Sequence, residues 1–360
     1  MAKNKKEFRE ELTRQFLSLL ENEQLNWIKE WSSMTALPFN GSSGKSYAGI
    51  NRFKLFVTIL QNNWTDPRFM TFNQIKKMKR DDGQGMCSVI KGSKGVQVEY
   101  WFLMDRLKAF GQKGKYCTFQ EAQKLIDKGL RESSDFQLSA RYYTVFNGTQ
   151  IEGLPEYVQE RKRNIDVQRD EIVDKISDSM KVPIEYNDGD QCYYRPSEDK
   201  IYLPKPEYFN SQYAFVSTAL HELGHSTGAA HRLHRDIENF FGTEEYAYEE
   251  LVAEMTSCFI SSEIRMPEDN DQEYWEYHIK NHAGYVQSWA SVLKNDCNAL
   301  PKAIKQAEQA ADYLEMHAGI ISEPEYEKKY SRANHTLTIN ENNEIKTEQE
   351  QVPAMEPVFA

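Results

Sequence analysis

The chain has 360 residues, 39% of them hydrophobic and 12% aromatic, which is enough for about two domains with ordinary cores. No apolar run approaches the ~18–20 residues of a membrane span, so we expect neither a membrane protein nor a membrane partner. The net charge of −11 divides unevenly: residues 1–150 hold 24 Lys and Arg against 15 Asp and Glu, and residues 151–360 hold 20 against 40. This asymmetry indicates a basic region suited to nucleic acid, followed by an acidic one.

The five cysteines indicate a reducing compartment. They are scattered and odd in number, and no two are spaced as CxxC. The first residues, MAKNKKEF, lack the apolar core of a signal peptide. We therefore expect a cytoplasmic protein whose cysteines need not bind metal.

The first half combines an amphipathic helix with many aromatic and basic residues. Residues 8–20 have apolar positions at helical spacing, and a loop marked by Pro and Gly follows over residues 37–49. Aromatic faces can stack on splayed bases while Lys and Arg neutralise phosphates, which suits single strands better than a duplex. The alternative is that most of these aromatics are core residues and most lysines merely solvated. The contacts that we predict for the nucleic acid are Lys45, Tyr47, Arg52, Lys91 and Lys94.

The second half begins with a segment rich in both charges, residues 156–180, which is predicted to be a helix that links two domains. Two short strands ended by prolines follow at residues 192–196 and 200–204. Residues 213–220 then continue at helical spacing into the pentapeptide HELGH at 221–225. A strand followed by an HExxH helix is the arrangement of zinc peptidases, whose strand edge can hold an extended peptide.

The HELGH pentapeptide predicts a metal, a base and a reaction class together. On a helix, His221 and His225 are one turn apart on the same face, so their imidazoles can share one Zn²⁺. Glu222 beside them can polarise the water that attacks the substrate. The alternative is a core helix with a buried histidine pair and no metal.

Two residues compete to be the third protein ligand of a catalytic zinc. The first is His231, because HELGHSTGAAH also fits the pattern HExxHxxGxxH, in which Gly228 lets the chain leave the helix. The second is Glu250, on a predicted helix that carries carboxylates over residues 246–255. Glu254 is one turn from Glu250, so one of them can ligate while the other orients a ligating histidine.

At this point the sequence resembles a known family. The segments HELGHSTGAAHRL (221–233) and YAYEELVAE (246–254) are similar to the zincin-like domain of ArdC-type antirestriction proteins, which mobile genetic elements carry. The first half contains, in the order of that family's DNA-binding domain, LPFN (37–40), GKSYAGIN (44–51), MTFNQ (70–74), IKGSKGVQV (90–98) and VFNGTQIEGLP (145–155). The resemblance implies that Glu250 is the third ligand and leaves His231 as the second choice. Residues 105–140 depart from the family pattern as an insertion with a predicted helix at 118–128.

The resemblance implies an α+β fold, with a mixed sheet and helix domain that binds single-stranded DNA at residues 8–155 and a zincin-like metallopeptidase domain at residues 181–320. It implies a gluzincin-like site in which His221, His225 and Glu250 bind Zn²⁺. Glu222 is then the catalytic residue, and Glu254 orients a ligating histidine without binding the metal itself. The expected role is antirestriction in the cytoplasm of a bacterial host or recipient cell, with single-stranded DNA and a host protein as partners. The alternative is a purely DNA-binding protective protein whose zinc site is structural or vestigial. Residues 333–360, polar and acidic, are expected to form a disordered tail.

Overall fold

The computed structural model describes residues 5–23, 37–158, 169–209, 211–237, 243–264 and 287–334. Both helices and strands occur in each half of the chain, which confirms the predicted α+β class. Among the residues described, no helix combines the length and the apolar character that crossing a bilayer requires. From position 335 onward, the predicted tail lies outside the described part of the chain.

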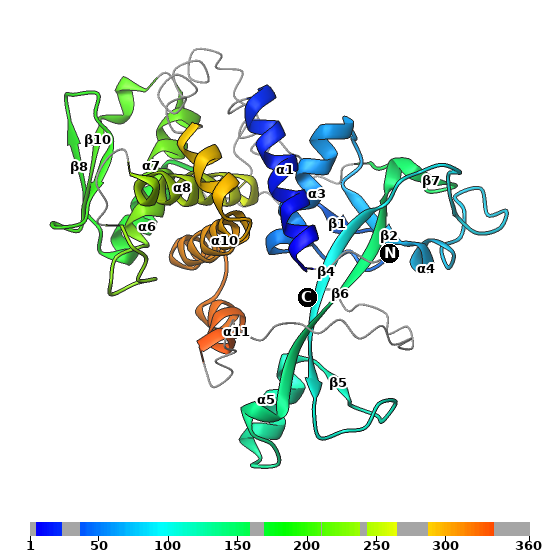
Figure 1. Cartoon of the computed structure of the whole chain (residues 1–360). Helices are drawn as coiled ribbons and strands as arrows, with labels where there is room; N and C mark the ends of the chain where they lie inside the picture. The colour runs from blue at the N-terminus through cyan, green and yellow to red at the C-terminus, as the bar shows by residue number, and fades with distance from the viewer. Residues whose placement is uncertain are drawn as a thin grey trace.

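The first half is a five-stranded sheet packed with two helices (Figure 1). The helices are α1 (Lys5–Glu23), which contains the predicted amphipathic segment, and α3 (Gly49–Asn62). The strand order is β1-β2-β6-β4-β5, with bounds β1 (Phe39–Asn40), β2 (Arg68–Thr71), β4 (Val96–Asp105), β5 (Tyr116–Cys117) and β6 (Phe136–Asn147). Val96 and Val98 of β4 pack against α3, because alternate residues of a strand face the same side. A small lobe with its own core holds α4 (Phe72–Ile75), β3 (Ser88–Val89), η2 (Gly148–Gln150) and β7 (Ile151–Glu152).

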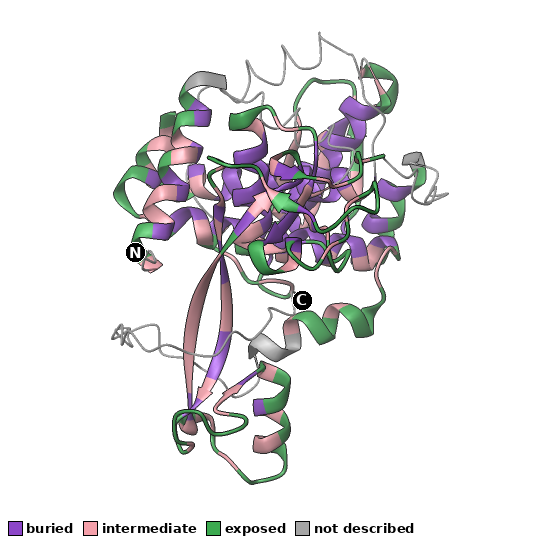
Figure 2. Cartoon of the chain, turned by 90° about the vertical axis from the view of Figure 1, so that its right-hand side faces the viewer, coloured by how far each residue is buried: buried purple, intermediate pink, exposed green. Residues whose placement is uncertain are grey.

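Strands β4 and β6 continue beyond this sheet as a two-stranded arm, visible in Figure 1 and, as a largely half-buried ribbon, in Figure 2. Their antiparallel register runs without interruption from Val96↔Val145 to Asp105↔Phe136. The tip contains β5, α5 (Phe119–Asp127) and η1 (Ser133–Asp135), so the predicted helix is present. Thr118 caps α5 by accepting a hydrogen bond from the Glu121 amide at 3.2 Å. A separate small core stabilises the tip, made of Leu103, Cys117, Ala122 and Phe136.

The second half packs helices on a three-stranded sheet of order β8-β10-β9. Its strands are β8 (Ile184–Asn187), β9 (Tyr193–Arg195) and β10 (Lys200–Pro204), followed by η3 (Pro206–Tyr208). Its helices are α6 (Arg169–Met180), α7 (Gln212–Ser226), α8 (Glu244–Glu263), residues 287–295, α10 (Ala299–Ala318) and α11 (Glu323–Asn334). The HExxH motif lies on α7, which begins at Ser211 because that side chain accepts from the Ala214 amide at 3.1 Å. Strand β9 is antiparallel to β10 and forms one edge of the sheet.

One hydrophobic core joins the two halves. It contains Phe16 of α1 and Phe53 of α3 together with apolar residues of α6, α7, α8 and α10. Of the predicted linker helix 156–180, residues 159–168 lie outside the described part of the chain, and residues 169–180 form α6, whose Ile172 and Ile176 are buried in this core. The two halves consequently stabilise each other by burying apolar surface that each would otherwise expose.

A buried ion pair crosses the same boundary. Arg52 of α3 donates to Glu308 of α10 and contacts Glu263 at the end of α8 at 3.4 Å, while the Gly49 amide donates to Glu308 at 2.9 Å. Burial opposes ionisation of Glu308, but Arg52 and Lys329 hold its carboxyl pKa below the usual value. Arg52 is thus part of the packing between the halves, and the prediction that it contacts nucleic acid does not fit the structure.

Glu315 of α10 is buried near the same ion pair. Burial, reinforced by Glu263 and Asp312, raises its carboxyl pKa well above the usual value, against the opposing effect of Arg52 and Lys329. Folding raises the carboxyl pKa of Glu315. The protonated side chain therefore makes its full contribution to the free energy of unfolding below the pKa of the unfolded state, about 4.3. This contribution is lost as the pH rises through the folded value.

We therefore expect Glu315→Gln to raise the thermal unfolding midpoint at pH 7.5 and to have a smaller effect at pH 5. The neutral amide keeps the shape of the side chain without the cost of burying a charge. Scanning calorimetry at the two pH values measures this difference. The matched control is Glu207→Gln at an exposed position, which should leave both midpoints unchanged. An unchanged or lower midpoint for Glu315→Gln at pH 7.5 would contradict the expectation.

Candidate metal centre

Helices α7 and α8 bring three metal-binding groups together. The donor atoms of His221, His225 and Glu250 all lie within 4.8 Å of one another. The two histidine Nε2 atoms are 3.2 Å apart, and the Glu250 carboxylate oxygens lie 3.5 Å from His221 Nε2 and 3.6 Å from His225 Nε2. The structure thus places the two motif histidines and the preferred third ligand at one point.

The three donor atoms form a triangle whose size fits a single small divalent cation. Metal–ligand bonds of ~2.0–2.2 Å in a tetrahedral arrangement place neighbouring donors ~3.3 Å apart, close to the three separations found here. Both imidazoles also turn Nε2 toward the common point, because their Nδ1 atoms contact carboxylates on the other side. Two imidazole nitrogens and a carboxylate that converge at ligand separation are the donor set of a metal site, which favours a metal over a buried histidine pair.

Each histidine has its own supporting carboxylate on α8. His221 Nδ1 lies 3.1 Å from Glu254, and His225 Nδ1 lies 3.3 Å from Glu249. Such contacts fix the tautomer and orientation of a ligating imidazole. The role predicted for Glu254 fits this geometry, whereas the role of Glu249 was missed, although three acids on one predicted helix opposite two histidines hinted at it.

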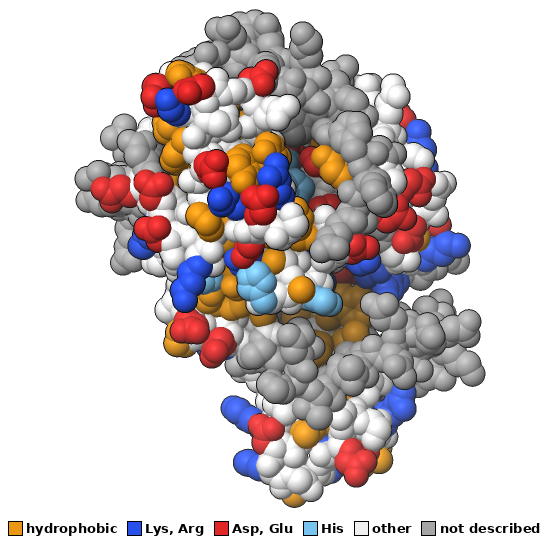
Figure 3. Space-filling model, turned by 90° about the vertical axis from the view of Figure 1, so that its left-hand side faces the viewer, with side chains coloured by type: hydrophobic (Ala, Val, Ile, Leu, Met, Phe, Trp, Pro, Cys, Tyr) orange, Lys and Arg blue, Asp and Glu red, His pale blue; other side chains and the backbone are white. Residues whose placement is uncertain are grey.

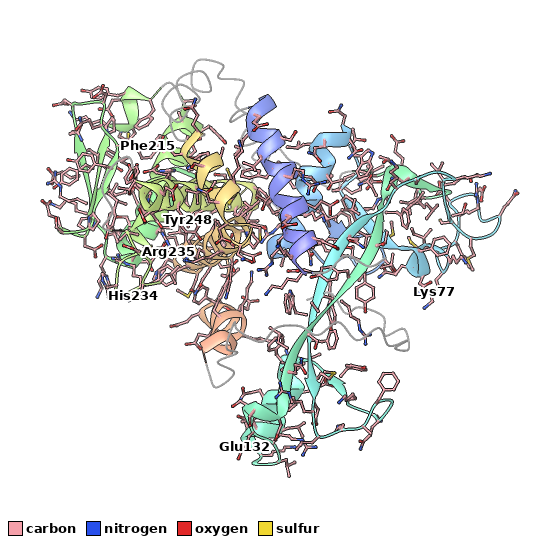
Figure 4. The ribbon with its side chains drawn as sticks, in the orientation of Figure 1. Lys77, Glu132, Phe215, His234, Arg235 and Tyr248 are labelled. Atoms are coloured by element: carbon pink, nitrogen blue, oxygen red, sulfur yellow. The ribbon has the colours of Figure 1, made fainter. Side chains whose placement is uncertain are left out.

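Glu249 is in turn held by Arg235, which follows α7 in the chain and lies close to α8 (Figure 4). The guanidinium donates to both carboxylate oxygens of Glu249, at 2.7 and 3.0 Å, and to the Gly224 carbonyl at 2.8 Å. A bidentate pair of this kind fixes the carboxylate in direction as well as position. Arg235 therefore orients His225 through Glu249.

We expect Arg235→Met to weaken metal binding by about 10- to 100-fold, the usual effect of losing such a supporting group. Without the guanidinium, Glu249 is buried without its main counter-ion and loses its fixed orientation. Competition with a chromogenic chelator measures the affinity. Arg80→Met is the matched control, because Arg80 pairs with Asp82 in the first half, away from the centre. Equal affinities of the two variants would show that Arg235 does not orient the ligand.

The charges at the centre suit a divalent cation. Burial disfavours the charged imidazole, yet hydrogen bonds to Glu250 and Glu254 hold the pKa of His221 well above its usual value. At Glu250, burial is outweighed by His221 and His225, and the carboxyl pKa falls to about 2. The Tyr246 side chain also hydrogen-bonds to Glu250. Glu250 is therefore an ionised carboxylate, the form in which an oxygen ligand binds a cation.

Glu222 lies beside the three ligands in a different environment. Its side chain is buried, and burial raises its carboxyl pKa even though His221, His225 and the Tyr194 amide favour the ionised form. Tyr194 belongs to edge strand β9, and its hydroxyl donates to Asp199 at 2.8 Å. The hydrogen bond from the Tyr194 amide to the Glu222 carboxyl places this edge strand directly beside Glu222. A carboxyl with a raised pKa is suited to accept a proton and to return it.

The other predicted ligand lies elsewhere. His231 is 63% exposed at its side chain, and its Nε2 is 3.4 Å from Asp199 rather than at the metal-binding triangle. The chain does turn at Gly228, where an added Cβ would come within 2.4 Å of Ile237. This turn leads His231 to the surface, so the longer motif match is coincidental in this structure.

The residues predicted to contact nucleic acid divide into two groups. Lys45, Lys91 and Lys94 are exposed on the first half. Tyr47 is only 2% exposed, and its hydroxyl donates to the Phe69 carbonyl at 3.3 Å within the core beneath α3. Tyr47 cannot present its ring to a base, and the prediction for it, as for Arg52, does not fit the structure.

The sequence and the fold both match known proteins. Residues 6–146 match the family described as the N-terminal domain of anti-restriction factor ArdC, and residues 171–308 match a zincin-like metallopeptidase family, MPTase-PolyVal. The chain is 33% identical over 314 residues to a DNA primase TraC of Escherichia coli, covering 86% of this chain and 20% of TraC. A second TraC of Escherichia coli is 32% identical, with 27% of its length covered, so the chain spans about a quarter or less of these relatives.

Other relatives match over nearly their whole length. The protein y4eC of Sinorhizobium fredii (strain NBRC 101917 / NGR234) is 30% identical, with 86% of this chain and 91% of y4eC covered. The crystal structure of the antirestriction protein ArdC from plasmid R388, metal-free, superposes with a TM-score of 0.63 at 27% identity, covering 87% of this chain and 98% of ArdC. The Mn(II)-bound structure of that ArdC gives a TM-score of 0.61 at 27% identity, covering 86% and 97%, and together with the donor triangle it implies a divalent metal here. The chain therefore belongs to the family of ArdC-type antirestriction proteins, with an ArdC-like N-terminal domain and a zincin-like C-terminal domain.

Proposed function

We propose that this protein binds single-stranded DNA through its first half and hydrolyses peptide bonds of a host protein at the His221–His225–Glu250 centre, with zinc as the metal. The observation that carries the proposal is the presence of a buried carboxyl, Glu222, next to a complete three-ligand site. A purely structural metal site has no use for such a group.

The chain's own residues supply the parts of a hydrolytic reaction. His221, His225 and Glu250 would hold the zinc, which supplies a Lewis acid that polarises the scissile carbonyl. Glu222 takes the proton from the attacking water and delivers it to the leaving amine, a role for which its place beside the ligands and strand β9 suits it. Strand β9 is the sheet edge beside Glu222, so an extended peptide can align there by backbone hydrogen bonds.

The charge distribution supports a DNA-binding role for the first half. Residues 1–150 carry a net charge of +9, and the exposed lysines Lys45, Lys91 and Lys94 supply cations for phosphates. The face of the second half in Figure 3 shows acidic and basic side chains intermixed, a surface without the single sign that attracts a polyanion. Affinity for an oligonucleotide should therefore fall steeply with salt and should be lowered by loss of these three lysines.

A Glu222→Gln variant tests the peptidase. We expect it to bind metal as the wild type does and to lose antirestriction, scored as survival of unmodified plasmid DNA in a restricting recipient cell. The amide has the shape of the carboxyl but cannot accept the proton. Glu207→Gln at an exposed position is the control and should retain full protection. Full protection by Glu222→Gln would instead support the alternative, a protective DNA-binding protein with a structural or vestigial metal site.

A further inference from the structure

The arm carries a continuous row of aromatic rings and one guanidinium on one face. On β4 and β6 the row consists of Tyr100, Phe102, Arg141 and Tyr143, and Tyr116 of β5 extends it toward the tip. The register explains the shared face, because Tyr100 pairs with Arg141 and the alternate residue Phe102 lies on the same side. We refer to these five residues as the arm row.

The side chains of the arm row contact one another in sequence. Tyr100 stacks on Phe102 at 6.3 Å with 21° between the ring planes, and Tyr143 meets Tyr100 edge-on at 6.3 Å. The Arg141 guanidinium lies 4.9 Å from the centre of the Phe102 ring and 4.8 Å from that of Tyr116. Among the described residues no carboxylate pairs with Arg141, so its positive charge is held on the rings.

A role in the core accounts for only part of the arm row, because Phe102 is buried and Tyr143 packs against a core cluster. The same face of β4 is covered by α3 at Val96 and Val98, where the side chains are buried and aliphatic. Tyr143, which pairs with Val98, packs against the edge of that core. Farther along the arm Phe102 is buried, whereas Tyr100, Arg141 and Tyr116 are half-buried. The two strands that carry these side chains extend out of the body as a ribbon, which Figure 2 shows.

The basic residues that could anchor a phosphate chain lie at the near end of the same strand. Lys91 and Lys94 are exposed and directly precede β4, whose residues from Val98 to Met104 span about 20 Å at the usual rise of a strand. The half-buried rings of Tyr100, Tyr116 and Tyr143 can each accept one base, and an arginine among them adds attraction for both base and phosphate. A duplex keeps its bases stacked and inaccessible to flat rings, so the row suits unpaired strands.

We propose that the arm row is a base-stacking platform on which single-stranded DNA lies along β4 and β6, with its phosphates entering past Lys91 and Lys94. The inference deepens the proposed function and rests on it, since it names the surface by which the first half holds the strand. Tyr116 lies within the insertion at residues 105–140 and the other four residues flank it, so the arm lengthens the DNA path beyond the body of the domain.

The test is the affinity of the full-length protein for a fluorescent oligothymidylate, measured by anisotropy at fixed salt. We expect Tyr100→Leu and Arg141→Ala each to weaken binding roughly 5- to 100-fold, the usual effect of losing one stacking partner. Matched controls on the other ribbon face and at the tip are Tyr142→Leu, whose ring packs on Phe8 at 5.2 Å, and Arg131→Ala, which pairs with Asp105. The salt dependence should be unchanged in Tyr100→Leu, because that variant removes no charge.

Two outcomes separate this inference from the proposed function. Wild-type binding that persists undiminished in Tyr100→Leu and Arg141→Ala would overturn the platform and leave single-strand binding standing. Failure of the wild type to bind the oligonucleotide would overturn both. Ultraviolet cross-linking of bromodeoxyuridine DNA to the wild type gives an independent readout that needs no variant, with adducts expected on Tyr100, Tyr116 or Tyr143. Adducts confined to other peptides would also overturn the platform.

Discussion

A His221→Ala variant should emerge from purification without stoichiometric metal. The substitution removes one of three donors that lie at metal-binding separation, and the Glu254 carboxylate then loses the imidazole that it orients. Loss of a supporting contact alone usually costs 10- to 100-fold in affinity, so loss of a ligand should cost at least about 100-fold. Elemental analysis of the purified protein measures the content, and a chelator competition measures the affinity.

His231→Ala is the matched control for that experiment. His231 lies on the surface beside Asp199 and should contribute nothing to the centre, so this variant should keep the wild-type metal content. If His231→Ala instead lost the metal and His221→Ala kept it, the longer motif would define the site and the geometry described above would be wrong. Elemental analysis of the wild-type protein shows whether the bound metal is zinc or another divalent ion.

An Arg52→Met variant should lose about 3–5 kcal/mol of unfolding free energy, the usual cost of removing one partner of a buried ion pair. Arg52 and Glu308 are both largely buried, and among the residues described Glu308 would keep only the Gly49 amide and the more distant Lys329 as partners. Urea denaturation monitored by circular dichroism measures the loss. The core that the two halves share predicts one cooperative transition for both of them in the wild type.

Two comparisons test the cause of this loss. Adding Glu308→Gln to Arg52→Met should recover part of the stability, because a neutral amide needs no counter-ion. Folding lowers the pKa of Glu308, so its contribution is present above the unfolded value of about 4.3 and is lost as the pH falls further. The difference between wild type and Arg52→Met should therefore shrink in acid. Lys6→Met, which breaks an exposed pair with Glu10, should change the stability by less than about 0.5 kcal/mol.

The centre could be predicted from sequence because its ligands follow local rules. His221 and His225 are one helical turn apart, and Glu250 and Glu254 lie on one face of the next helix, so spacing alone places each pair. Glu249 and Arg235 were missed because their contact joins a helix to the irregular chain after α7, and no periodicity marks it. His231 matched a motif, but the turn at Gly228 sends it to the surface.

The predictions for nucleic-acid contacts failed where burial decides the role of a residue. Tyr47 and Arg52 stand among basic and aromatic neighbours in the sequence, yet one lies in the core under α3 and the other meets an acid 256 positions later. Composition cannot distinguish a lysine or arginine in solvent from one that pairs across an interface. Similarly, the charges of residues 156–180 suggested a linker, while Ile172, Val173 and Ile176 at helical spacing pack α6 into the core.

The common core has a consequence for how the protein is inherited. A recombination event that separated α1 and α3 from the metallopeptidase helices would leave both products with a solvent-exposed hydrophobic surface. The two parts should therefore travel between genomes as one evolutionary unit, even when that unit is built into a longer polypeptide. The alignments agree: TraC and y4eC each match 86% of this chain, a stretch too long for either half alone.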